Sequence, residues 1–393
     1  MLDKTRVPLS RPYLGKEEIE AVAEVLRTPF LSLGPRFREF EAMFSEYMGG
    51  RQAIAVSSGT AGLHLAVRAV GVREGDLVIT TPFSFISSSN VILYERGVPL
   101  FFDIDDKTLN LDPGRVWDYL RKKTRRDKEG KLIDIERGKR VAAMILVHIF
   151  GHPVDMDPFL EMSREYDIPI VEDACEALGA LYKGKKAGTF GEISVFAFYP
   201  NKQITTGEGG MVTTREDRQA ELIRSMRNQG RGDNGKWLNH VRLGYNYRMD
   251  ELSAALGIAQ MKKLDAILIK RDEIAKLYTE LLSEVEGVEA PFVAPWARMS
   301  WFVYVVKLKE GIDRERIMKR LEEAGIDSRP YFPPIHLQPF YRELFGFREG
   351  DFPVTESVSR RTVALPFYTG LEPEKIQYVV EELEKAIKKE GSF

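Results

Sequence analysis

The chain has 393 residues, of which 44% are hydrophobic and 30% charged, a composition ordinary for a soluble globular protein. Its formal net charge of -2 excludes a global electrostatic case for nucleic-acid binding, so an acidic substrate would need a local basic pocket. The single cysteine, Cys175, excludes an internal disulfide and fits a reducing compartment.

Neither a secretory signal nor a membrane span is expected. No apolar h-region follows the N-terminal segment Met1-Leu2-Asp3-Lys4-Thr5-Arg6, and no apolar run approaches about 18 residues. We therefore expect the protein to be cytoplasmic.

The first part of the chain predicts helices and then a change of period. Amphipathic helices are predicted over 17–27 and 37–47, because apolar residues recur there at helical spacing. A short apolar run at 53–56 leads into the turn Ser57-Ser58-Gly59-Thr60 and then into apolar residues at helical spacing over 63–70. This order predicts a strand, a tight turn and a helix.

Strands and helices then alternate, which indicates the fold class. Buried strands are predicted at 77–80, 100–104, 142–147 and 168–171, with helices such as 158–166 between them. Apolar strands that alternate with helices indicate an α/β fold with a mostly parallel central sheet covered by helices on both faces.

The C-terminal third predicts a second, smaller domain. A long helical pattern covers 250–282, and a strand at 302–306 and helices at 314–324 and 373–388 follow it. We predict a large α/β domain over 1–265 and a small C-terminal α+β domain over 266–393. The charged segment 122–140 mixes both signs, which favours a solvated excursion over a binding patch.

The turn Ser58-Gly59-Thr60 is a candidate phosphate site because it ends a strand and opens a helix. A helix N-terminus offers free N–H groups and the positive end of the helix dipole, and Thr60 adds a hydroxyl. Such turns also serve simply to connect elements and cap helices, so both interpretations stay open. The glycine patterns of a P-loop and of a dinucleotide-binding turn are missing here.

Carboxylates and aromatic rings follow two of the predicted strands. Asp173 and Glu176 lie after the strand at 168–171, at the edge where open α/β sheets bind ligands. An aspartate there could pair with a protonated pyridine nitrogen, or it could cap a helix. Phe83 and Phe85 follow the strand at 77–80, where either could stack on a flat ring or pack in the core.

Lys202 lies between an apolar, aromatic run at 196–199 and a Thr/Gly-rich loop at 204–210. An ammonium against apolar walls is poorly hydrated, which favours the neutral amine that can form a Schiff base with an aldehyde or ketone. The alternative is a lysine that extends to water from the end of a strand.

His148 and His152 are separated by Gly151, which breaks any helix between them, so no metal site is predicted.

These features together point to one cofactor. An amine for a Schiff base, an aspartate for a pyridinium, an aromatic ring for stacking and a helix N-terminus for a phosphate are the groups that bind pyridoxal phosphate. They occur in the order Thr60, Phe85, Asp173, Lys202 along the predicted sheet.

Several stretches resemble the DegT/DnrJ/StrS family of nucleotide-sugar aminotransferases, in particular its perosamine-synthase-like members. The resemblance is carried by residues 8–12, 56–60, 171–174, 204–210, 244–249 and 334–339 and covers nearly the whole chain. It implies the fold type I of pyridoxal-phosphate-dependent aminotransferases.

The resemblance also implies roles for individual residues. Lys202 would form the Schiff base with the cofactor and act as general acid and base, and Asp173 would hold the pyridine nitrogen. The other implied contacts are Phe85 on the ring, Glu176 near the ring hydroxyl, Gly59 and Thr60 on the phosphate, and Asn246 on the phosphate of the neighbouring subunit in a homodimer with shared active sites. Arg329 and His336 would contact the sugar nucleotide, and Arg231 and Lys236 are further candidates for its diphosphate.

Two positions depart from the family pattern. Ala197 stands five residues before the lysine, where the family often has a serine that contributes to the phosphate site. Glu176 stands where the family often has glutamine or histidine, and a glutamate facing a phenolate oxygen requires a proton on one of the two groups.

The leading hypothesis is transamination of a nucleotide-linked keto-sugar, a 4-keto-6-deoxyhexose, with glutamate as amino donor, in amino-sugar or polysaccharide biosynthesis. One alternative is a sugar dehydratase of the same family, in which the lysine is typically replaced by histidine. Another is a non-catalytic regulatory protein with this fold, and the presence of Lys202, Asp173 and Asn246 argues against it. A nicotinamide-dependent oxidoreductase is not favoured, because this sequence lacks the glycine fingerprint of that class of enzyme.

Overall fold

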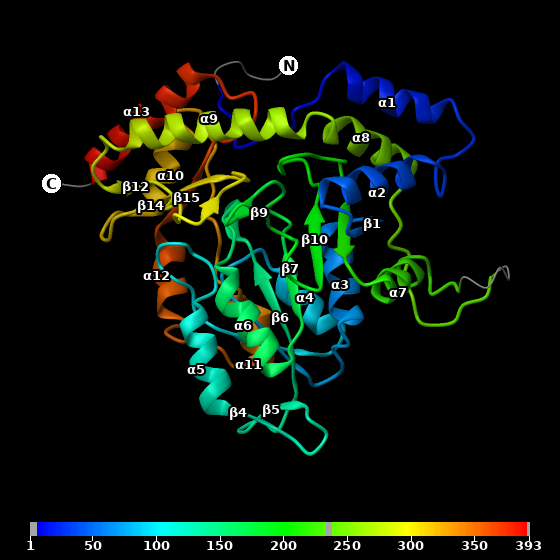
Figure 1. Cartoon of the computed structure of the whole chain (residues 1–393). Coiled ribbons are helices and arrows are strands. Elements are labelled where there is room, and N and C mark those ends of the chain that lie inside the picture. The colour runs from blue at the N-terminus through cyan, green and yellow to red at the C-terminus, as the bar shows by residue number, and fades with distance from the viewer. Residues whose placement is uncertain (1–5, 233–237, 391–393) are drawn as a thin grey trace.

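The computed structural model describes residues 6–232 and 238–390. Lys236 and the first five residues of the N-terminal segment lie outside these ranges. A seven-stranded sheet forms the centre of the molecule, and its strand order is β1-β11-β10-β7-β6-β2-β3 (Figure 1). The strands are β1 Gln52–Val56, β2 Leu77–Thr80, β3 Val98–Phe101, β6 Val141–Val147, β7 Ile170–Asp173, β10 Ile193–Ala197 and β11 Gly210–Thr214.

The sheet is mostly parallel, as predicted. The pairs β10–β7, β7–β6, β6–β2 and β2–β3 are parallel. Strand β11 runs antiparallel to both of its neighbours, β1 and β10. Strand β1 therefore points the same way as the five parallel strands, and the carboxyl ends of these six strands share one edge of the sheet.

Helices cover both faces of this sheet, because alternate apolar residues of each buried strand point to opposite sides. One face packs on α3 Gly59–Ala69, α4 Ser87–Tyr94 and α7 Asp217–Arg227. The other face packs on α2 Arg36–Tyr47, α5 Pro113–Lys123, α6 Met156–Tyr166 and α8 Glu251–Met261. The predicted α/β class is thus confirmed.

A smaller sheet with its own core follows toward the C-terminus. Strands β12 Val288–Glu289, β14 Tyr304–Leu308 and β15 Thr362–Leu365 pack against α9 Leu264–Leu282, α10 Arg314–Glu323 and α13 Pro373–Glu390. Val7 joins this core as well and pairs with Ile326. Because α9 contributes its first residues to the large core and its later residues to the small one, the division at 265/266 stays a prediction.

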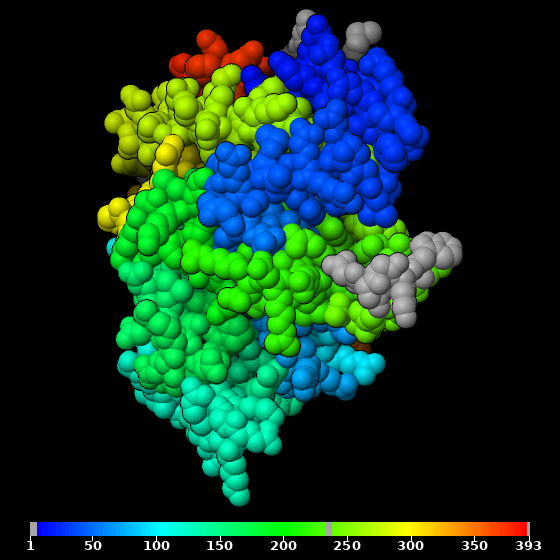
Figure 2. Space-filling model, turned by 45° about the vertical axis from the view of Figure 1, so that its right-hand side comes forward, coloured from blue at the N-terminus to red at the C-terminus, as the bar shows by residue number. Residues whose placement is uncertain are grey.

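The remaining elements are short or lie at the periphery. They are α1 Lys16–Leu26, β4 Thr124–Arg126, β5 Leu132–Asp134, η1 Ile149–Gly151, β8 Leu181–Tyr182, β9 Lys185–Lys186, β13 Ala297–Arg298, η2 Ile335–Leu337, α11 Pro339–Phe345 and α12 Pro353–Arg361. The charged segment forms the β4–β5 hairpin, which projects from the lower end of the molecule (Figures 1 and 2).

Two elements differ from the sequence prediction. The helical pattern over 250–282 is divided into α8 and α9, which are separated at Lys262 and Lys263. The strand predicted at 100–104 ends earlier, at Phe101, because the Asp103 carboxylate accepts hydrogen bonds from the N–H groups of Ile104 and Thr355 and draws the chain away from the sheet.

Candidate active site

Lys202 lies in the turn that follows β10. Its backbone N–H donates to the carbonyl of Tyr199 at 2.9 Å, which fixes the turn. Its Nζ lies 3.5 Å from Oε1 of Glu176 and 3.7 Å from the centre of the Phe302 ring, and only 12% of the side chain is exposed. The amine is therefore enclosed by an aromatic wall and a carboxyl group, instead of extending to water.

A cavity of about 510 Å³ surrounds this amine. The predicted residues that line it are Gly59, Thr60, Phe85, Asp173, Glu176, Ala197 and Lys202. They come from the segments that follow β1, β2, β7 and β10, so the cavity opens at the shared carboxyl edge of the strands, where α/β sheets bind ligands. Residues that are up to 143 positions apart thus meet in one place.

Asp173 ends β7 with its carboxyl group buried in the wall of the cavity. Its carboxylate accepts a hydrogen bond from the N–H of Cys175 at 3.2 Å, and only 5% of Asp173 is exposed. Burial raises the pKa of this carboxyl above its ordinary value, opposed by the Cys175 bond and by the charge of Lys202. A buried carboxyl with so few donors favours a cationic partner from within the cavity, as a protonated ring nitrogen would be.

Glu176 is held between Lys202 and the turn η1. Its Oε2 accepts the N–H of Phe150 at 2.9 Å, and Phe150 has a left-handed backbone with φ 55°, an uncommon conformation for a bulky residue. Burial raises the pKa of the Glu176 carboxyl, although the nearby Lys202 ammonium opposes this shift. Removal of the positive charge of Lys202 would therefore raise the pKa of Glu176 further.

The N-terminus of α3 is built for close approach. The Ser58 side chain accepts the N–H of Ala61 at 3.0 Å and caps the helix. A Cβ atom on Gly59 would lie 2.7 Å from the Cβ of Ala197 and 3.1 Å from Sγ of Cys175, so this position has room only for glycine. Gly59 and Thr60, the first two residues of the helix, line the cavity, and a helix N-terminus suits a phosphate group.

The structure separates the two phenylalanines that the sequence left open. Phe83 is fully buried and packs edge-on against Phe150 and Phe332 in the core. Phe85 is 59% exposed and lines the cavity, where its ring is free to stack on a flat ligand.

Several residues of the cavity were missed from the sequence. They are Ser84, Ser87, Val147, Cys175, Tyr199, Asn201, Glu208, Gly209, Phe302, Tyr331 and Phe332, whereas Ser58 belongs to the predicted phosphate turn. Phe302, Tyr331 and Phe332 come from the C-terminal part of the chain and close the cavity on one side. The run Tyr331-Phe332 between prolines was the available signal, but nothing in the sequence shows that it returns to the large sheet.

Three predicted residues do not line this cavity and lie near the surface. Asn246 is exposed and its backbone pairs with Asn228. Arg329 is exposed and donates to the carbonyl of Ser328, and Arg231 pairs through its backbone with His240.

His336 is the one substrate residue whose position disagrees with its predicted role. Its side chain is fully buried, its Nε2 lies 3.0 Å from Oε1 of Glu356, and the rings of Phe347 and Phe352 enclose it. This packing leaves no side-chain surface for a substrate, so a direct contact from His336 is not supported.

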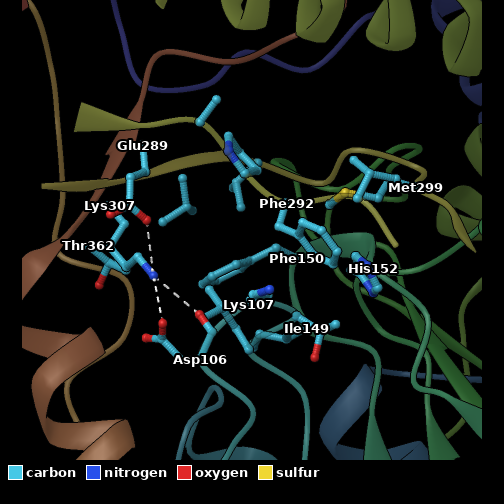
Figure 3. A pocket seen from close by; sticks show the side chains of 17 residues that line it. Asp106, Lys107, Ile149, Phe150, His152, Glu289, Phe292, Met299, Lys307 and Thr362 are labelled. Atoms are coloured by element: carbon cyan, nitrogen blue, oxygen red, sulfur yellow. Dashed lines mark hydrogen bonds and ion pairs between the residues drawn. The ribbon is translucent and has the colours of Figure 1, made fainter. Parts of the chain in front are cut away.

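A second cavity, of about 480 Å³, is lined in part by Ile149 and Phe150 of η1 (Figure 3). Ile149, Phe150 and Met299 contribute to its apolar wall, and the ammonium of Lys307 lies 3.2 Å from carboxylate oxygens of both Asp106 and Glu289. None of the predicted site residues lines this second cavity, so the cavity at Lys202 is the candidate active site. In residues 6–232 and 238–390, no cluster of His, Cys, Asp and Glu is arranged to hold a metal ion.

Comparison with known proteins shows the family of the chain. The sequence profile of the DegT/DnrJ/EryC1/StrS aminotransferase family matches residues 12–384. The chain belongs to this family. It is therefore a pyridoxal-phosphate-dependent aminotransferase, since members of the family depend on this cofactor.

Individual relatives match this aminotransferase over almost their full length. The GDP-perosamine synthase of Caulobacter vibrioides is 35% identical over 391 residues, which are 98% of this chain and 100% of that protein. The solved structure of S. venezuelae DesV in complex with a ketimine intermediate has a TM-score of 0.86 at 30% identity and covers 97% of this chain and 98% of its own. Helicobacter pylori PseC is an aminotransferase involved in the biosynthesis of pseudoaminic acid. Its structure has a TM-score of 0.89 at 26% identity and covers 98% of this chain and 100% of its own.

The residues of the aminotransferase cavity fit pyridoxal phosphate. The buried carboxyl of Asp173 has a single backbone donor, the glycine turn at Gly59 leaves space that a Cβ would fill, and Lys202 presents an enclosed amine. These groups match the ring nitrogen, the phosphate and the aldehyde of the cofactor in turn. In the part of the chain that the structure describes, no helix combines the length and apolarity that crossing a bilayer requires.

Proposed function

We propose that this aminotransferase transfers the amino group of glutamate to a nucleotide-linked keto-sugar, a 4-keto-6-deoxyhexose, for amino-sugar and polysaccharide biosynthesis. The observation that carries the proposal is the convergence of Lys202, Asp173 and the α3 N-terminus in one cavity. The nucleotide-sugar class is supported by the match to GDP-perosamine synthase, which covers nearly the whole of both chains.

In this proposal four residues of the chain hold the ring and the phosphate of the cofactor. Asp173 binds the ring nitrogen, Phe85 stacks on the ring, and Gly59 and Thr60 bind the phosphate through the helix N-terminus and a hydroxyl. When bound, pyridoxal phosphate supplies a carbonyl group that exchanges with amines and an electron-accepting ring. Ala197 adds no hydroxyl, so phosphate binding depends more on α3 and on Thr60.

Lys202 moves the proton in the proposed reaction. Its neutral Nζ can take a proton from the α-carbon of the amino donor and return it to the carbon that receives the amine. Glu176, 3.5 Å from Nζ, stabilises the ammonium form by its charge and otherwise holds a proton of its own. Phe302 and the buried walls exclude water from the amine.

The substrate contacts and the assembly also belong to the proposal. The exposed side chain of Arg329 and the half-buried Arg231 are candidates to bind the diphosphate. We further propose a cytoplasmic homodimer in which Asn246 completes the phosphate site of the neighbouring subunit. Its exposure, and its absence from the cavity of its own chain, support a role in trans.

A panel of keto-sugar nucleotides tests this function. The cofactor-loaded protein is incubated with glutamate and GDP-, UDP- or dTDP-linked 3-keto and 4-keto sugars, and the products are identified by mass spectrometry and NMR. We expect 2-oxoglutarate and an amino sugar from one 4-keto substrate. Loss of a sugar hydroxyl without gain of nitrogen would indicate a dehydratase, and protein that stays colourless with pyridoxal phosphate would indicate a non-catalytic member.

A further inference from the structure

Asn246 lies between two tyrosines on an extended segment whose backbone is fixed. The N–H of Tyr245 donates to the carbonyl of Met226 at 2.6 Å, and the N–H of Tyr247 donates to the carbonyl of Arg227 at 3.0 Å. Side chains alternate along an extended segment, so the two tyrosines share one side and Asn246 takes the other. The exposed amide of Asn246 is thus presented from a fixed backbone.

The two tyrosine rings form a stacked pair. Their centroids are 4.9 Å apart and their planes differ by 10°. His64 packs against both rings, at 4.7 Å from Tyr245 and 5.8 Å from Tyr247. Contacts of this kind fix the rotamers of both tyrosines and, through them, the segment that carries Asn246.

A network of hydrogen bonds holds the hydroxyl groups of the two tyrosines in place. The Tyr247 hydroxyl lies 3.1 Å from Nδ1 of His64, and Nε2 of His64 lies 2.9 Å from Oε1 of Glu95. The Tyr245 hydroxyl donates to the same oxygen of Glu95 at 3.4 Å, and Arg68 donates to both oxygens of Glu95 at 2.9 and 2.7 Å.

The protonation state of His64 in this hydrogen-bond network follows from its burial. Only 5% of His64 is exposed, and burial lowers the pKa of its imidazole although Glu95 opposes the shift. The neutral ring then donates from Nε2 to Glu95 and accepts at Nδ1 from the Tyr247 hydroxyl. Each hydroxyl of the pair therefore donates into a partner that is already fixed in orientation.

The same helix that opens at the cofactor cavity anchors this network. His64 and Arg68 lie on α3, whose first residues, Gly59 and Thr60, line the cavity. In addition, the N–H of Ser57, just before the cap of α3, donates to the carbonyl of Tyr247 at 2.9 Å. One rigid element thus holds both this chain's own phosphate turn and the segment that bears Asn246.

We infer that Tyr245 and Tyr247, fastened by His64 and Glu95, are positioning residues that orient Asn246 for the cofactor phosphate of the partner subunit. The inference rests on the proposed homodimer with shared sites. It predicts that a lost tyrosine hydroxyl weakens cofactor binding in the other subunit's site and leaves the site of its own chain unchanged.

Heterodimers with a single productive site test this directly. A Lys202→Ala chain is paired with a chain that keeps Lys202, so that only the latter can bond the cofactor covalently, using Asn246 from the Lys202→Ala chain. Tyr247→Phe is placed either on the Lys202→Ala chain or on the chain that keeps Lys202. Pyridoxal phosphate is titrated, and the absorbance of the Lys202-bound cofactor is followed.

We expect the first arrangement to bind the cofactor about fivefold to tenfold more weakly, the effect of one lost hydrogen bond, and the second to match the dimer without Tyr247→Phe. An equal loss in both arrangements, or a loss only in the second, would overturn the inference. Tyr119→Phe, which removes a hydroxyl that donates to Asp134, is the matched control and should change neither arrangement. Unchanged thermal midpoints show that the variants fold.

A separate pairing isolates the proposed dimer from the positioning role. Lys202→Ala and Asn246→Ala chains are combined, which leaves one site with both residues intact. Recovery of wild-type cofactor affinity at that site supports sharing. If affinity is not recovered while Asn246→Ala homodimers bind weakly, the shared site itself is wrong, whereas recovery together with equal losses for Tyr247→Phe would reject only the positioning role.

Discussion

Asp173 and Glu172 are neighbours on β7, yet their carboxyl groups face opposite sides of the strand and their pKa values shift in opposite directions. Glu172 accepts hydrogen bonds from Nε2 of His148, from the N–H groups of Gly188, Phe190 and Gly191, and from the Ser194 hydroxyl. Although burial opposes its ionisation, these donors lower the pKa of Glu172. Asp173, with one backbone donor, has a raised pKa and faces the cavity.

Asp173→Asn should separate stability from cofactor binding. Because the pKa of Asp173 is raised in the folded state, the folded protein binds more protons than the unfolded chain just above about pH 4, and its stability falls as the pH rises through that window. The cofactor-free variant should lack this loss and unfold at a higher temperature than the wild type at neutral pH. Its affinity for pyridoxal phosphate should fall about tenfold to hundredfold, as for a lost charged hydrogen bond. Equal pH dependence in calorimetry of both proteins would contradict this.

Glu172→Ala should lower the stability of the folded protein, in contrast to Asp173→Asn. It strands the imidazole of His148 and three backbone N–H groups in the interior, so we expect a loss on the order of 3 kcal/mol in the free energy of unfolding. Urea denaturation of the cofactor-free protein measures it. A variant as stable as the wild type would show that these donors find water or other partners.

Lys202→Ala should abolish turnover and leave the fold intact. The side chain contacts the cavity wall and contributes little to the core, so the thermal midpoint of the cofactor-free protein should stay unchanged. The rate should fall by at least about 10²–10⁴-fold, the usual contribution of a general acid and base, and the absorbance of a lysine-bound cofactor should disappear. Lys183→Ala, at an exposed ion pair with Asp157, is a control that should retain both.

Phe83→Ala and Phe85→Ala should divide packing from binding. Phe83 is fully buried, so its truncation should cost about 3–5 kcal/mol in unfolding free energy. Phe85 is 59% exposed, so its truncation should change stability little but weaken cofactor binding, measured by titration. Comparable destabilisation by both would contradict the division.

Ala197→Ser should strengthen the phosphate site. Ala197 lines the cavity beside Gly59, and a hydroxyl there would reach the same space as Thr60. We expect cofactor affinity to rise by up to about tenfold, the effect of one added hydrogen bond. Gly59→Ala should do the reverse, because its Cβ would lie 2.7 Å from that of Ala197. An unchanged Kd for Ala197→Ser would place the phosphate elsewhere.

Much of the fold could be predicted because it is encoded locally. The predicted strands that became β1, β2 and β6 were correct to within one residue, and the predicted strand–turn–helix around Gly59 is present, although α3 already begins at Gly59. The position of β1 at the sheet edge beside antiparallel β11 was not predictable, since strand order depends on contacts between residues about 150 positions apart.

The residues of the candidate site also differ in whether the sequence alone could reveal them. Residues that follow a strand, such as Asp173 and Lys202, could be found because the carboxyl edge of a parallel sheet gathers them. His336 could not be judged from sequence, because its burial depends on Glu356 and on two phenylalanines that fold around it.

The fold class could be predicted from local periodicity, and residue chemistry pointed to pyridoxal phosphate and to the residues proposed to bind it. The folded structure was needed to show that Phe85 and not Phe83 faces the cavity, that Glu176 lies beside Lys202, and that Tyr331 closes the site from the C-terminal part. Burial depends on the packed surroundings and not on the residue alone, and burial in turn sets the pKa of a carboxyl group and the space that a ring can reach.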